Sequence, residues 1–133
     1  YATAYEWALK LKELTYTVAA PYSSADFQHG PVAMVDPGFP VLAVMPRGAV
    51  YQDLMDLMVR LKRDHQVELL VLSNEEAALS LADRAVPLPQ DLPEWLSPIV
   101  AIVPGQLFCY HLTKAKGLDT ESPRMLSKVT KTA

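Results

Sequence analysis

Residues 40–73, PVLAVMPRGAVYQDLMDLMVRLKRDHQVELLVLS, decide the fold class of this 133-residue chain. The stretch begins and ends with continuous apolar segments, residues 40–45 and 68–73, a pattern typical of parallel strands that are buried on both faces. Between them, Leu54, Leu57 and Leu61 recur at helical spacing and predict an amphipathic helix of about fifteen residues. A strand, a helix and a second buried strand form the βαβ unit of a parallel sheet.

The flanking segments continue this alternation. A short helix is predicted over residues 75–81, and a third strand over 85–88, where the proline indicates a position near the sheet edge. The pattern predicts an α/β fold, a three-layer α/β/α sandwich with a mostly parallel sheet. The chain opens on a helix, whereas doubly wound domains open with a strand, so we expect the sheet to lack its first strand.

A long last helix is predicted from Ser97 to about Lys116, where Gly117 ends it. Its apolar run is interrupted by polar residues and by Pro104, so we interpret it as a buried, proline-bent helix rather than a membrane span. The residues after Gly117 are polar and locally basic, which is typical of a tail.

The amino-acid composition of the chain excludes several classes of function. Half of the residues are hydrophobic and 20% are charged, as in one globular domain, and the net charge of −3 predicts neither a nucleic-acid nor a membrane partner. The single Cys109 excludes an internal disulfide, fits the cytoplasm and lies among apolar neighbours, which predicts a buried structural thiol. The histidines lack metal-ligand spacing and no glycine-rich phosphate loop occurs, so we expect no metal and no cofactor.

Glu6, Lys10 and Glu13 form a charged stripe in the first predicted helix, because at ~100° per residue they fall within about 60° of one another. Apolar residues are expected to wall the stripe: Ala2 and Leu9 on one side, Trp7 and Leu14 on the other. The water-facing sector would then contain Tyr1, Tyr5, Ala8 and Lys12.

Two interpretations of this stripe remain open. Intrahelical salt bridges, each contributing about 0.2–0.5 kcal/mol, are the simpler one. The apolar border favours the other, an acid–base cluster, because desolvation perturbs carboxylate and ammonium pKa values. His29, before Gly30 and Pro31, is either an exposed capping residue or an acid–base group, and Lys128 is either a solvated tail lysine or part of a site.

Three segments together resemble a known family. They are EWALKLKE at 6–13, FQHGP at 27–31 and DTESPRMLSKVT at 119–130. They are similar to the second sugar-isomerase (SIS) domain of the glucosamine-6-phosphate synthase family and of its relatives, the two-domain glucosamine-6-phosphate deaminases and fructosamine-6-phosphate deglycases. The resemblance implies a flavodoxin-like SIS domain over residues 1–117 and, over 118–133, a tail that closes over the sugar site.

The resemblance also implies a role for each matched residue. Glu13 would be the base that moves a proton between sugar C1 and C2 and would contact the substrate, with Lys10 and Glu6 as its charged neighbours. His29 would help to open the sugar ring across a subunit interface in a homodimer. Lys128 would bind the substrate and can form a Schiff base with an open-chain sugar.

The first SIS domain of the family, which holds the substrate phosphate, does not occur in this sequence. We therefore expect the C-terminal half of an aldose–ketose isomerase or deaminase that acts on glucosamine 6-phosphate and is inactive as an isolated chain. The SSADF segment at 23–27 resembles the corresponding segment of the two-domain deaminases more than that of the synthase. The alternatives are the isomerase half of a glutamine–fructose-6-phosphate aminotransferase, with fructose 6-phosphate as substrate, and a non-catalytic module that senses phosphosugars.

Overall fold

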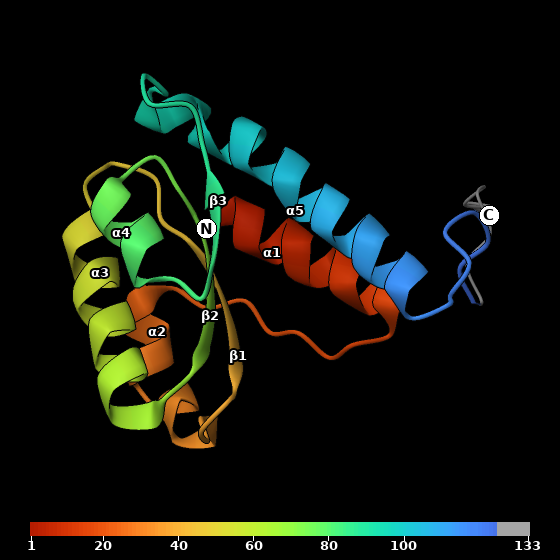
Figure 1. Ribbon diagram of the computed structural model, residues 1–133, viewed down its shortest axis with the longest axis horizontal. Coiled ribbons are helices and arrows are strands. Elements are labelled where there is room, and N and C mark those ends of the chain that lie inside the picture. The colour runs from red at the N-terminus through yellow and green to blue at the C-terminus, as the bar shows by residue number, and fades with distance from the viewer. Residues whose placement is uncertain (125–133) are drawn as a thin grey trace, which may run out of the picture.

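Three layers make up the computed structural model, which describes residues 1–124 (Figure 1). The central sheet contains β1 (Pro40–Val44), β2 (Glu68–Ser73) and β3 (Arg84–Pro87) in the order β1-β2-β3. Both strand pairs are parallel, with Leu42 opposite Leu70 and Leu72 opposite Val86. The predicted α/β/α sandwich is confirmed, and the proline-containing β3 lies at an edge.

Helices cover both faces of the sheet. One layer contains α2 (Ser24–Gln28), α3 (Tyr51–Arg60) and α4 (Glu76–Leu81), and the other contains α1 (Ala2–Lys10) and α5 (Ser97–Ala115) (Figure 1). Two helices are extended by π-helical turns, η1 (Leu11–Thr15) after α1 and η3 (Leu61–His65) after α3. Short 3₁₀ turns occur at η2 (Pro31–Met34) and η4 (Glu94–Leu96).

The strand side chains alternate between two apolar clusters, as the period of two requires. Ala43, Leu69 and Val71 pack in the cluster that also contains Leu57 of α3. Leu72, with the half-buried Leu70, packs in the cluster that includes Trp7 of α1 and Cys109 of α5. The sheet therefore separates α1 and α5 from the layer that carries α2.

Close packing of α5 on α1 fixes the orientation of the first helix. Gly105 lies against the indole of Trp7, so closely that an added Cβ would come within 3.3 Å of the ring, and Phe108 meets that ring edge-on. Three predictions for α1 are wrong: Ala8, expected to face water, is buried, and Leu9 and Ala2, expected to wall the charged stripe, are exposed.

The long helix α5 is only half buried, which differs from the prediction. Ala101, Cys109 and Thr113 face the core, while Ile99, Val103, Leu107 and Tyr110 form an exposed apolar stripe. Residues Glu94–Ala115 are the one part of the described chain with the length and composition of a membrane span, and 28% of their most apolar window is buried. Contact with α1 and the sheet covers one side of α5, so its outer side stays apolar and open.

Candidate active site

The charged stripe of the first helix is assembled as an ion-pair chain. Lys10 Nζ donates a hydrogen bond to Glu13 Oε2 at 2.8 Å and lies 3.8 Å from Glu6 Oε1. The spacings of three and four residues place these side chains on neighbouring turns of one face. The three side chains are 30–36% exposed, so the stripe is partly shielded yet accessible to a ligand.

Electrostatics keep the centre of the stripe cationic. The hydrogen bond to Glu13 raises the pKa of the Lys10 ammonium, partial burial opposes this effect, and the charges of Glu13 and Glu6 add to the rise. Beneath the stripe, burial raises the pKa of the Cys109 thiol to about 11, so the thiol is uncharged at neutral pH. The arrangement therefore offers a carboxylate that can accept a proton beside a cation that can stabilise negative charge.

Glu13 lies in the π-helical turn η1 rather than in regular α-helix. Such turns are rare and are frequently found at functional sites. Thr15 closes the turn by donating from Oγ1 to the Leu11 carbonyl at 2.7 Å, and Tyr16 then leaves the helix in the left-handed conformation with φ of 55°. The sequence contains no signal for this widened turn, because LKELT has ordinary helical propensity.

One neighbour of the stripe comes from α5. Gln106 Nε2 donates to Glu6 Oε1 at 3.5 Å across the α1–α5 contact. The sequence analysis missed Gln106, because the contact joins positions about a hundred residues apart and depends on how the two helices pack.

The two other predicted residues are not assembled with the stripe. His29 is exposed at the carboxyl end of α2, whose layer lies on the opposite face of the sheet from α1 (Figure 1). Lys128 lies outside the described residues. The structure thus brings together Glu6, Lys10 and Glu13, and separates His29 from them.

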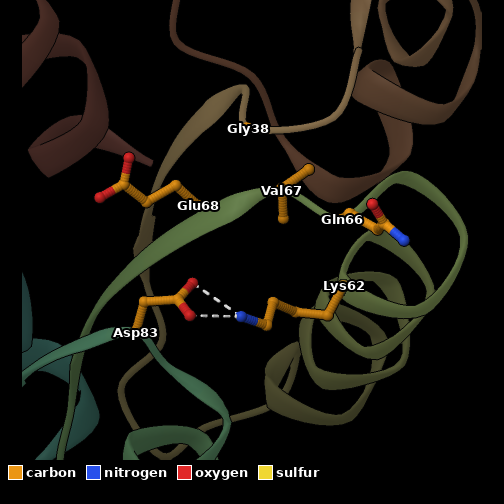
Figure 2. A pocket seen from close by; sticks show the side chains of 6 residues that line it. All are labelled: Gly38, Lys62, Gln66, Val67, Glu68 and Asp83. Carbon is orange, nitrogen blue, oxygen red and sulfur yellow. Dashed lines mark hydrogen bonds and ion pairs between the residues drawn. The ribbon is translucent and has the colours of Figure 1, made fainter.

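A depression at the amino ends of β1 and β2 is lined by other residues. Figure 2 shows Lys62 reaching across it to Asp83, whose two carboxylate oxygens accept hydrogen bonds from Lys62 Nζ at 2.6 and 2.7 Å. Asp83 Oδ2 also accepts from the backbone N–H of Leu69 at 2.7 Å. This ion pair fastens η3 to the sheet, and none of the predicted site residues that the structure describes lines the depression.

Comparison with known proteins identifies the fold family. The SIS domain model matches residues 1–114. Curated relatives named glutamine–fructose-6-phosphate aminotransferase [isomerizing] include those of Bacteroides thetaiotaomicron, 35% identical over 129 residues, and Gloeobacter violaceus, 39% identical over 129 residues. Each alignment covers 96% of this chain but 21% of the relative, so the chain spans about a fifth of the length of these proteins.

A solved structure of a similarly named aminotransferase also resembles this chain. The C-terminal domain of glucosamine-fructose-6-phosphate aminotransferase from Francisella tularensis superposes with a TM-score of 0.79 at 28% identity, over 90% of this chain and 34% of that one. The fold also matches a protein described as a putative tagatose-6-phosphate ketose/aldose isomerase from Clostridium novyi, with a TM-score of 0.75 at 18% identity, over 96% of this chain and 37% of that one. The chain belongs to the SIS domain family.

Proposed function

We propose that this chain forms the acid–base part of a phosphosugar isomerase site, within the C-terminal SIS domain of a longer protein. In this proposal the domain occupies residues 1–117, and residues 118–133 are the tail that closes over the sugar site. The observation that carries the proposal is the hydrogen bond from Lys10 to Glu13 at 2.8 Å. The two side chains are partly exposed at the end of the first helix of a SIS domain.

Glu13 is the base in this proposal. Its carboxylate removes the proton from the carbon next to the sugar carbonyl, C1 of the ketose, and the C–H electron pair forms the C1–C2 double bond of an enediolate while the carbonyl electron pair moves onto O2. A proton then passes from the protonated Glu13 to C2, the former carbonyl carbon, and the hydroxyl proton moves from O1 to O2, so that the carbonyl is now at C1. Lys10 stabilises the negative charge that develops on the enediolate, because its ammonium is already held beside Glu13. Glu6 balances the charge of Lys10 from the other side.

Two further residues complete the site from elsewhere. His29 is exposed and lies on the other face of the sheet from α1, which supports a role in the site of a second copy, where it would assist ring opening. Lys128 supplies a primary amine that can attack the open-chain carbonyl. The functional unit in this proposal is therefore a homodimer.

In this proposal a separate domain holds the substrate phosphate. The loop before α3 is a usual place for an anion, but here the Glu94 carboxylate fills it and accepts from the backbone N–H of Ala49 at 3.2 Å. Gly48 leaves the room for Glu94, since an added Cβ would lie 2.4 Å from its carboxyl carbon. The exposed apolar stripe of α5 supports packing of a first SIS domain, which carries the phosphate site.

The names of the relatives favour one substrate pair. Those described above are glutamine–fructose-6-phosphate aminotransferases, which supports fructose 6-phosphate and glucosamine 6-phosphate over other sugar phosphates. This favours the isomerase half of such an aminotransferase over the deaminase that segment 23–27 suggested.

The test is proton exchange in the longest protein that contains this chain. Glucosamine 6-phosphate is incubated in deuterium oxide and the C2 proton is followed by NMR. Loss of that signal on the timescale of turnover is expected for an isomerase. Binding of the sugar with no exchange would contradict the proposal and indicate a sensing module instead.

A further inference from the structure

Lys116, at the end of α5, makes two hydrogen bonds to the segment in which the first helix ends. Its Nζ donates to the Thr15 carbonyl at 2.6 Å and to Thr17 Oγ1 at 3.0 Å. The last carbonyls of a helix lack partners within it, and a lysine ammonium placed there stabilises them. Lys116 therefore ties the end of α5 to the turn η1, which carries Glu13.

Thr15 extends this connection into the turn itself. Thr15 is completely buried, and its Oγ1 donates to the Leu11 carbonyl at 2.7 Å. The hydroxyl oxygens of Thr15 and Thr17 lie 2.9 Å apart, at hydrogen-bond distance. A threonine that bonds back to the carbonyl four residues earlier often bends a helix. Here that bond joins the first and last residues of η1, so it spans the turn in which Glu13 is the middle residue.

The end of α5 is itself closed by hydrogen bonds, which fixes the backbone that carries the Lys116 side chain. The backbone N–H of Lys116 donates to the Leu112 carbonyl at 2.9 Å, and that of Leu118 donates to the carbonyl of the buried Thr113 at 3.0 Å. Gly117 has φ of 68° and supplies the left-handed residue that this closure requires. The Lys116 ammonium therefore extends toward η1 from a defined helix end.

The segment that Lys116 contacts has a backbone that its own residues do not favour. Tyr16, between the two threonines, has φ of 55°, in the left-handed region that a bulky residue rarely adopts. The turn before it is π-helical, a rare form of helix. Such conformations persist only where surrounding contacts hold them. The bonds made by Lys116 and Thr15 are contacts of this kind, and they lie within two residues of Glu13 on its carboxyl side.

We propose that Lys116 and Thr15 are positioning residues that hold the π-helical turn and so fix the direction of the Glu13 carboxylate. The proposal rests on the proposed function, in which Glu13 is the carbon base. A displacement of about 1 Å, caused by a change away from the chemistry, can lower a rate by about 10²-fold. Neither Lys116 nor Thr15 touches the sugar in this proposal, so removal of either lowers kcat and leaves KM unchanged.

The experiment combines C2 proton exchange of glucosamine 6-phosphate with amide hydrogen exchange of residues 11–16, in the longest protein that contains this chain. Lys116→Met removes the ammonium, and Thr15→Val removes the hydroxyl with little change in volume. Each variant should lower kcat by about tenfold at unchanged KM and should speed amide exchange of residues 11–16. The double variant should lose about as much as either single variant, because both act through one turn.

Matched variants separate positioning from a general effect on the fold. Lys116→Arg and Thr15→Ser keep the donors and should recover most of the lost kcat. Lys114→Met removes the same charge from an exposed position of α5 and should change neither kcat nor amide exchange. Thr17→Val alters an exposed residue, so it tests the same contacts without a change in the core, and a smaller loss of the same kind is expected.

Three results would overturn the proposal. Unchanged amide exchange of residues 11–16 in Lys116→Met and Thr17→Val would show that these contacts do not hold the turn. Faster amide exchange with unchanged kcat would remove their role in the reaction, and a raised KM at unchanged kcat would make Lys116 a substrate ligand instead. Failure of the proposed function is a different result, in which Glu13→Gln exchanges the C2 proton as fast as the unaltered protein.

Discussion

Lys10 Nζ donates to Glu13 Oε2 at 2.8 Å on a face of the first helix where both side chains are partly exposed. Exposed pairs of this kind stabilise a fold by only about 0–1 kcal/mol, so stability gives little reason for the arrangement. Glu6 on the other side of Lys10 and the widened helical turn around Glu13 make a chemical role the better explanation. The proposed function therefore depends on the properties of this pair.

The first prediction concerns the titration of Lys10. Its hydrogen bond to Glu13 is the largest cause of the raised pKa, so Glu13→Gln should lower the pKa of Lys10 toward 10.5, and Glu6→Gln should lower it less. Nζ chemical shifts followed by NMR against pH would measure both changes. Because the folded-state pKa is raised, the stabilising pair is complete below pH 10.5 and is lost as the pH rises through the raised value. An equal pKa in all three proteins would contradict the pairing.

Cys109 is predicted to be unreactive in the native protein. Its pKa of about 11 and complete burial leave almost no accessible thiolate at pH 8. Alkylation should be at least about a hundredfold slower in the native protein than in the denatured protein. Mass spectrometry of iodoacetamide-treated samples measures the two rates. Comparable rates would show that the α1–α5 contact opens readily.

Gly105→Val tests the close approach of α5 to α1. The new side chain would meet Trp7, whose indole is already 3.3 Å from the position of an added Cβ, and overpacking of this kind costs about 1–3 kcal/mol. Urea unfolding should therefore show a lower midpoint. Gln106→Val places the same side chain at the next, exposed position, and a comparable loss there would assign the effect to helix propensity instead.

Asp83→Asn tests the ion pair between Lys62 and Asp83 that Figure 2 shows. The pKa of Asp83 is lowered, first by the N–H of Leu69 and then by Lys62, so the ionised carboxylate stabilises the fold above pH 3.8. This contribution is lost as the pH falls through the lowered pKa. The thermal midpoint of Asp83→Asn should lie below that of the unaltered chain at pH 7, and the difference should vanish in acid. Asp91→Asn, an exposed control, should show no such pH-dependent difference.

Local patterns predicted most of the fold. The two apolar strands and the helix within 40–73 each have a clear period, and the parallel pairing of β1 with β2 follows from the helix between them. The water-facing side of α1 was predicted correctly at Tyr1, Tyr5 and Lys12. It was predicted wrongly at Ala8, because nothing near this residue in the sequence indicates that tertiary packing buries it. Similarly, α5 contains enough apolar residues to suggest full burial, whereas α1 and the sheet cover only one of its sides.

The candidate site was predictable where it depends on spacing along one helix. The Glu6–Lys10–Glu13 chain follows from intervals of four and three residues. The contacts of Gln106 with Glu6 and of Lys116 with Thr15 join segments about a hundred residues apart, so only the packed chain identifies them. The separation of His29 from the stripe likewise depends on which face of the sheet α2 covers.

The most direct test of Glu13 as the carbon base uses Glu13→Gln in the longest protein that contains this chain. The measurement is the exchange of the C2 proton of glucosamine 6-phosphate with solvent. Glu76→Gln, an exposed glutamate of α4, is the matched control and should exchange like the unaltered protein. Glu13→Gln should retain sugar-phosphate binding while exchange falls by about 10²–10⁴-fold, the usual contribution of a general base. Exchange by Glu13→Gln at the rate of the control would contradict the assignment of Glu13 as the carbon base.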